Sequence, residues 1–213
     1  MNPPITSETA RALYADGGSS HDFDHVLRVT RLAERIAHVE GADLAIVRTA
    51  ALLHDIAESS GRRDHHARGA AMAREILAGQ PPEFVDAVAH AIEAHRFRSE
   101  PAPRTLEAQV VFDADKLDIT GAIGVARAFA YAGEHGNVLW NTPWPEIAAG
   151  GGDARTQPLV LGAAYTPSHE FVYKLDRISE RLYTAAARAI AQDRERFLAA
   201  FFDRLDQEAL GQA

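Results

Sequence analysis

The sequence predicts an all-α protein, and three observations support this prediction. Apolar residues recur at three- and four-residue steps along most of the chain, which is the spacing of one face of a helix. Glycines, prolines and capping residues fall between these periodic segments, where helices are expected to begin or end. The one candidate strand, "AQVVF" at 108–112, has no second strand to pair with. We therefore expect one helical domain over residues 1–213.

The first half of the chain predicts several helices in succession. A helix is expected over 24–40, with Gly41 as its stop, and Asp43 can cap the next helix, which runs into His54. Further helices are expected over 70–79, before the Pro81–Pro82 pair, over 83–95, and over 106–133 as one or two helices broken near Gly121.

The periodic pattern fails between residues 133 and 167. This segment holds many of the glycines and prolines and both tryptophans, Trp140 and Trp144. A long irregular loop inside a domain is usually functional or mobile. The tryptophans could stack on a nucleobase, or they could close the core or a dimer contact. Helical periodicity returns for two C-terminal helices over about 169–209.

Composition excludes several classes of protein. The 213 residues are 46% hydrophobic, and 22 basic against 30 acidic side chains give a net charge of 22 − 30 = −8. This charge argues against a broad surface for nucleic acid or anionic membrane, although a local basic pocket is compatible with it. The lack of cysteine excludes disulfides and thiolate sites. No secretory signal and no apolar run of roughly 20 residues is visible, so we expect a cytoplasmic protein.

Four short segments place histidine and carboxylate side chains near helix ends: "HDFDHVLRV", "LLHDIAES", "VAHAIEAHRF" and "FDADKLD". Burying an imidazole beside a carboxylate is costly unless both find partners. A satisfied hydrogen bond in the core is one such partner, and a metal ion is the other. Mixed nitrogen and oxygen ligands suit manganese, iron, nickel, cobalt or zinc.

The order of these segments resembles the HD-domain metal-dependent phosphohydrolases: a His, then a His-Asp pair after "ALLH", then an Asp in "DADKLD". The resemblance runs from about His21 to the C-terminus and implies an HD-domain helical bundle with its metal-binding core at about 21–132. "HDFDHVLRV", "DADKLDITGAIGVARAFAYAG" and "HEFVYKL" are similar to a bacterial subfamily of stand-alone HD hydrolases. Some of its members cleave deoxynucleoside triphosphates to monophosphate and pyrophosphate.

This resemblance implies one divalent metal ion, with manganese favoured over iron, nickel, cobalt, zinc or magnesium. Its ligands would be His25, His54, Asp55 and Asp115. Asp113 and Asp118 are then expected to be hydrogen-bonding neighbours of the site.

Roles for Glu58 and Lys116 follow from the same resemblance. Glu58 lies three residues after Asp55 and would orient or deprotonate the attacking water, with a solvated helix end as the alternative. Lys116, directly after Asp115, would bind phosphate. Further candidates for a positive or polar substrate pocket are Arg28, Arg62, Arg63, His95 and Arg96.

A second metal ion is the open alternative, because dinuclear HD proteins carry additional histidines between the His-Asp pair and the last Asp. His65 or His66 together with His95 would complete such a set. The other interpretation of His95 is a core histidine bonded to a carbonyl. His21 and Asp22 would orient the first ligand.

We therefore expect a metal-dependent phosphohydrolase acting on a nucleotide. The alternatives are a di-iron HD-type oxygenase, which needs the additional histidines as ligands, and a catalytically degenerate HD binding module. We expect a small phosphorylated substrate as partner, no stable binding of nucleic acid and no membrane association, and a homodimer is plausible.

Overall fold

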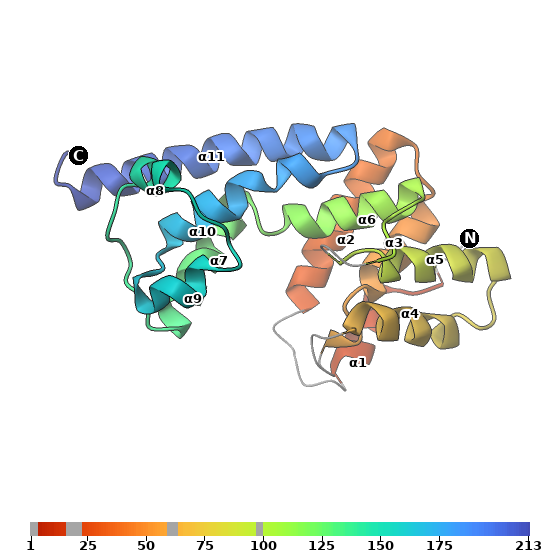
Figure 1. Cartoon of the computed structure of the whole chain (residues 1–213). Coiled ribbons are helices and arrows are strands. Elements are labelled where there is room, and N and C mark those ends of the chain that lie inside the picture. Colours follow the sequence, from red (N-terminus) through yellow and green to blue (C-terminus); the bar gives the residue numbers. More distant parts are fainter. Residues whose placement is uncertain (1–3, 16–22, 59–63, 97–99) are drawn as a thin grey trace. The chain divides into compact units, whose positions relative to one another are not determined.

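The computed structural model describes residues 4–15, 23–58, 64–96 and 100–213, and every regular element in these ranges is helical (Figure 1). The all-α prediction is confirmed. The described part of the chain contains no helix that is long and apolar enough to cross a membrane. Two units can be distinguished: residues 1–118 with 182–187, and residues 119–181 with 188–213. Each unit is described by itself, and the single domain over 1–213 stays a prediction.

The first unit is built from six helices and the first residues of a seventh. The six are α1 (Ser7–Ala15), α2 (Phe23–Glu40), α3 (Leu44–Leu53), α4 (His65–Ile76), α5 (Pro82–Glu93) and α6 (Leu106–Leu117). The helix expected over 24–40 is α2, and Gly41 ends it with φ +77°. Asp43 caps α3 as expected, because its carboxylate accepts from the backbone N–H of Ala45 and Ile46.

Helix α3 is the centre of this unit. It packs against α2, α5 and α6, and α4 packs beside α5. Its residues Ala50 to Leu53 are fully buried, so the helix carries the chain into the interior of the unit. The residues that follow its last turn, His54 and Asp55, are therefore delivered to a place that the neighbouring helices surround.

Residues 182–187 are joined to the end of α6 by a buried carboxylate. Asp113 accepts hydrogen bonds from the backbone N–H of Tyr183 and from both the N–H and the hydroxyl of Thr184. These contacts lie just before the start of α11 (Ala185–Ala209). Asp113 is thus a structural residue that fixes this segment.

The second unit contains the rest of α11 and a group of shorter elements. These are α7 (Gly121–Glu134), α8 (Trp144–Gly150), α9 (Gln157–Leu161), α10 (Pro167–Tyr173), and 3-10 turns at Gly162–Ala164, Leu175–Arg177 and Ser179–Arg181. The break predicted near Gly121 lies at the start of α7, where this glycine has φ +64°. Phe171 of α10 stacks on Phe202 of α11 at 4.6 Å between ring centroids.

The segment 133–167 is less irregular than its composition predicts, because α8 and α9 form within it. Asp206 of α11 accepts from the Trp140 indole N–H at 2.7 Å and from the Trp144 backbone N–H at 2.9 Å. The Trp144 indole N–H donates to Asp203, and its ring meets Phe171 edge to face. Both indole N–H groups are used within the second unit, and Trp144 packs against its core.

Candidate metal centre

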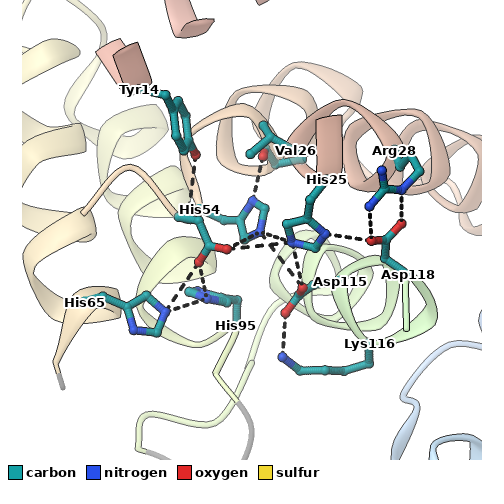
Figure 2. A network of polar contacts seen from close by, with 12 residues as sticks. Tyr14, His25, Val26, Arg28, His54, His65, His95, Asp115, Lys116 and Asp118 are labelled. Carbon is teal, nitrogen blue, oxygen red and sulfur yellow. Dashed lines mark hydrogen bonds and ion pairs between the residues drawn. The ribbon is translucent and has the colours of Figure 1, made fainter. Parts of the chain in front are cut away.

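The end of α3 orients His54 toward the interior of the first unit. His54 is completely buried, and its Nδ1 lies 2.8 Å from the carbonyl oxygen of Ala51. A carbonyl can only accept, so Nδ1 is the donor in this contact. The other ring nitrogen, Nε2, is left to face the remaining residues of the site (Figure 2).

His25, in the first turn of α2, lies against His54 and two carboxylates of α6. The Nε2 atoms of His25 and His54 are 3.3 Å apart. His25 Nε2 is 3.4 Å from Asp115 Oδ1, and its Nδ1 is 2.7 Å from Asp118 Oδ2. Two aromatic nitrogens that face each other at this distance need a proton or a metal ion between them.

Asp55 completes this first cluster. Its Oδ2 is 3.3 Å from His54 Nε2 and 3.7 Å from His25 Nε2, while Asp115 Oδ1 is 4.0 Å from His54 Nε2. Ligand atoms about 2.0–2.2 Å from one ion are themselves about 3–4 Å apart in tetrahedral geometry. The donor atoms of His25, His54 and Asp55 lie within 4.8 Å of one another, and Asp115 flanks them. The side chains present fit a divalent metal ion.

The other oxygen of Asp55 belongs to a second cluster. Asp55 Oδ1 is 3.4 Å from His65 Nε2 and 3.3 Å from His95 Nε2, and these two nitrogens are 3.3 Å apart. His95 Nδ1 donates to the carbonyl of Ile92 at 2.6 Å, so in the neutral ring Nε2 carries the lone pair, as for His54. Asp55 therefore joins two groups of potential ligands.

His66 does not join either cluster. It is buried beside His65, with ring centroids 5.8 Å apart, and its Nδ1 has no hydrogen-bond partner among the residues that the structure describes. Of the two neighbouring histidines predicted as alternatives, His65 is the one that faces Asp55.

Burial and neighbouring charges shift the pKa values of these groups in opposite directions. In the first cluster the effect of the charges and hydrogen bonds is the larger one. Burial lowers the pKa of His25, but hydrogen bonds and charges of Asp115 and Asp118 raise it to about 10. Burial likewise raises the pKa of Asp55 and Asp115, but the neighbouring His54 and, for Asp115, Lys116 hold both well below the usual range. The carboxylates are thus ionised and need positive charge close by.

Positive side chains border the clusters. Lys116 Nζ lies 2.5 Å from Asp115 Oδ2 and above the ring of Phe112. Arg96 directly follows His95. Burial lowers the pKa of His66, and the charges of His65 and Arg96 lower it further. Arg28 instead directs Nε and Nη2 to Asp118.

Glu58 is held in the turn that follows Asp55. Its backbone N–H donates to the carbonyl of Asp55 at 2.9 Å, and the residue is partly buried. The turn that follows α3 therefore carries both the predicted metal ligand and the predicted base.

The contact between helix α1 and the site could not be read from the sequence. The Tyr14 hydroxyl, on α1, accepts from the backbone N–H of Asp55 at 3.2 Å (Figure 2). Tyr14 lies 41 residues before Asp55, in a segment without histidine or a charged motif, so no spacing rule indicates it. Four residues expected near the site, His21, Asp22, Arg62 and Arg63, lie outside the described residues.

Comparison with known proteins identifies the family. The sequence model of the HD domain family matches residues 22–120. YpgQ of Bacillus subtilis is 32% identical over 206 residues, which cover 94% of this chain and 90% of YpgQ. The chain belongs to the HD-domain superfamily. The predicted resemblance is confirmed.

Solved structures of stand-alone HD proteins agree with this assignment. An HD-superfamily hydrolase from Bacillus thuringiensis superposes with TM-score 0.74 at 25% identity, covering 97% of this chain and 95% of its own. YpgQ in complex with ADP superposes with TM-score 0.69 at 29% identity, and the match covers 95% of this chain and 94% of YpgQ. The present chain is also 34% identical over 130 residues to ribonuclease Y of Chloroflexus aurantiacus. These residues cover 60% of this chain and only 24% of that enzyme.

Proposed function

We propose that this HD protein is a metal-dependent phosphohydrolase that cleaves a nucleoside or deoxynucleoside triphosphate to monophosphate and pyrophosphate. The observation that supports it most directly is the convergence of His25, His54, Asp55 and Asp115 beside Lys116. The crystal structure of YpgQ with ADP supports a nucleotide as ligand, because YpgQ is similar over nearly the whole chain.

His25, His54, Asp55 and Asp115 would hold the ion, for which we favour manganese. Such an ion polarises a phosphoryl oxygen and lowers the pKa of a water molecule. Two histidines and two carboxylates leave the site with no net negative charge once a divalent ion is bound. A polyphosphate can then approach the otherwise acidic protein at this place.

Lys116 and Arg96 would bind the phosphate oxygens. Lys116 contacts Asp115 in the first group of ligands, and Arg96 follows His95 in the second. Positive side chains at these positions stabilise the charge that spreads over the phosphate oxygens during cleavage. His95 would contribute to substrate binding where only one metal ion is present.

Glu58 would accept the proton of the attacking water. Its position one turn after Asp55 supports this role. Glu58→Gln preserves size and hydrogen bonding but removes the base, so we expect a loss in kcat of about 10²–10⁴-fold with metal content unchanged. Metal analysis and turnover are measured on the same preparation. Full metal content with near-normal turnover would assign the proton to another group.

The second cluster supports a variant of this proposal with two metal ions. Asp55, His65 and His95 would hold the second ion, and Asp55 belongs to both groups of potential ligands. The di-iron oxygenase alternative depends on the same residues. Metal stoichiometry in the wild type and in His65→Ala separates these cases: a fall from two ions to one indicates a dinuclear centre, and a constant value of one excludes the oxygenase.

Product analysis tests the proposed reaction. The full chain is incubated with Mn²⁺ and a panel of nucleoside and deoxynucleoside triphosphates, and pyrophosphate and orthophosphate are quantified separately. Asp55→Ala serves as the negative control, and an RNA oligonucleotide as a second substrate class because of the partial similarity to ribonuclease Y. Release of pyrophosphate from the triphosphates supports the proposal. Orthophosphate release alone, or cleavage of RNA alone, contradicts it.

A further inference from the structure

His25 lies between two carboxylates that come from one face of α6. Asp115 and Asp118 are three residues apart, so their side chains lie on the same side at the end of the helix. The two ring nitrogens of His25 are divided between them: Nε2 is 3.4 Å from Asp115 Oδ1, and Nδ1 is 2.7 Å from Asp118 Oδ2. Only the second of these is a short, direct hydrogen bond.

Asp118 is itself held rigidly. The Nε of Arg28 donates to Asp118 Oδ1 at 2.8 Å, and its Nη2 donates to Oδ2 at 2.9 Å. This two-point contact fixes the plane of the carboxylate as a single hydrogen bond would not. The backbone N–H of Asp118 also donates to the carbonyls of Ala114 and Asp115, and its side chain is only 5% exposed.

Arg28 and His25 are also three residues apart, on the first two turns of α2. One face of α2 therefore presents a histidine and an arginine to one face of α6 that presents two carboxylates. Figure 2 shows Asp118 between Arg28 and His25, with Asp115 on the other side of the imidazole ring.

We propose that Asp118 and Arg28 are positioning residues that direct Nε2 of His25 toward the metal site. A carboxylate that accepts the Nδ1 proton keeps that proton on Nδ1, so that Nε2 is the nitrogen that loses its proton to bind a metal ion, and it fixes the rotation of the ring. Arg28 acts on His25 through Asp118. This assigns Arg28 a role other than the phosphate binding expected from the sequence. The inference rests on the proposed metal site.

His25 differs in this respect from His54 and His95. His54 and His95 direct Nδ1 to backbone carbonyls, of Ala51 and Ile92, which side-chain substitutions leave in place. The orientation of His25 depends on a side chain, so it can be tested by mutation.

The experiment measures the affinity of the full chain for Mn²⁺ in the absence of nucleotide, by competition with a chelator. The variants are Asp118→Asn, Arg28→Gln and the double variant, with Arg31→Gln as control because Arg31 is an exposed arginine on the same helix. We expect Asp118→Asn to weaken Mn²⁺ binding about 10- to 100-fold. Arg28→Gln should weaken Mn²⁺ binding less. The double variant should bind Mn²⁺ with the same affinity as Asp118→Asn, because Arg28 acts through Asp118.

The outcomes separate this inference from the proposed function. Wild-type affinity in Asp118→Asn, with the control also unchanged, overturns the inference alone. A raised KM for nucleotide in Arg28→Gln, with unaltered Mn²⁺ affinity, would assign Arg28 to substrate binding and would also overturn the inference. A wild-type chain that binds no divalent metal overturns the metal site and the inference together. Thermal unfolding identifies a variant that is misfolded, and Arg28→Gln then carries the test where Asp118→Asn does not fold.

Discussion

His54 and His95 of the first unit and His169 of the second unit use their ring nitrogens in opposite ways. In the first unit, Nδ1 of His54 and His95 donates to a backbone carbonyl, and Nε2 faces other potential ligands. In the second, Nδ1 of His169 accepts the backbone N–H of Thr166 at 3.1 Å and completes a capping box at the start of α10. A buried histidine whose acceptor nitrogen is used by its own helix is structural. One whose acceptor nitrogen faces carboxylates and other imidazoles can bind a cation.

Two aspartates of α6 show the same contrast. Asp113 accepts short hydrogen bonds from the backbone and hydroxyl of residues 183–184. Asp115, two positions later and on a different side of the helix, faces His25, His54 and Lys116. The first carboxylate is satisfied by neutral donors, and the second lies beside Lys116 and the imidazoles of His25 and His54. Four predictions test whether this difference in partners corresponds to a difference in role.

The largest effect is expected from Asp55→Ala, since Asp55 belongs to both clusters. Removal of its carboxylate takes a ligand from each group, so we expect metal content to fall to background. Hydrolysis should then fall by more than the about 10²–10⁴-fold that a general base alone contributes. Metal analysis and nucleotide turnover check this together. Asp43→Ala, which removes an exposed helix cap, controls for general loss of stability, and retention of metal by Asp55→Ala would contradict the role.

Lys116→Ala should separate substrate binding from metal binding. The lysine contacts Asp115 but is not itself a metal ligand, so metal content should remain unchanged. Loss of a charged hydrogen bond to phosphate should raise KM about 10- to 100-fold. Steady-state kinetics at saturating metal measure the effect, and Lys174→Ala, which removes the other lysine of the chain, is the matched control. Loss of metal, or an unchanged KM, would show that Lys116 has another role.

Asp113→Asn tests the structural member of the aspartate pair. The amide nitrogen of asparagine would face either the Tyr183 N–H or the N–H and hydroxyl of Thr184, depending on how the amide is oriented. In both orientations at least one of these donors loses its acceptor. We expect the free energy of unfolding to fall by about 1–3 kcal/mol, with metal affinity per folded molecule unchanged. Denaturant unfolding and metal titration measure the two quantities. A selective loss of metal affinity would place Asp113 in the site.

The sequence predicts the fold of the first unit well because its helices have regular apolar faces and clear caps, as at Gly41 and Asp43. It predicts less of the second unit, where α8 and α9 are short and depend on tertiary contacts such as those of Asp206. At the site, periodicity indicates that His95 is buried, as the structure shows. The pairing of Arg28 with Asp118 and the contact of Tyr14 with Asp55 bring together residues distant in sequence, and no local pattern encodes them.

The smallest effect concerns His169 and tests the structural side of the histidine comparison. Burial lowers its pKa below the ordinary value of 6.5, and its Nδ1 can accept the Thr166 N–H only while the ring is neutral. As pH falls through 6.5, the unfolded chain takes up a proton first and the native chain stays neutral. The contribution of His169 to stability is therefore present above pH 6.5 and is lost below it, by no more than about 1.4 kcal/mol per pH unit.

His169→Gln removes this titration and keeps the cap, because glutamine at this position of a capping box accepts the same backbone N–H. The melting temperature of the variant should match the wild type at pH 8 and fall less than that of the wild type between pH 6.5 and 5. The measurements are made with chelator present, so that metal binding in the first unit does not contribute to the difference. Equal loss of stability in both proteins would show that the protonation of His169 is not coupled to the cap. A variant already unstable at pH 8 would mean that the imidazole ring contributes packing that glutamine does not replace.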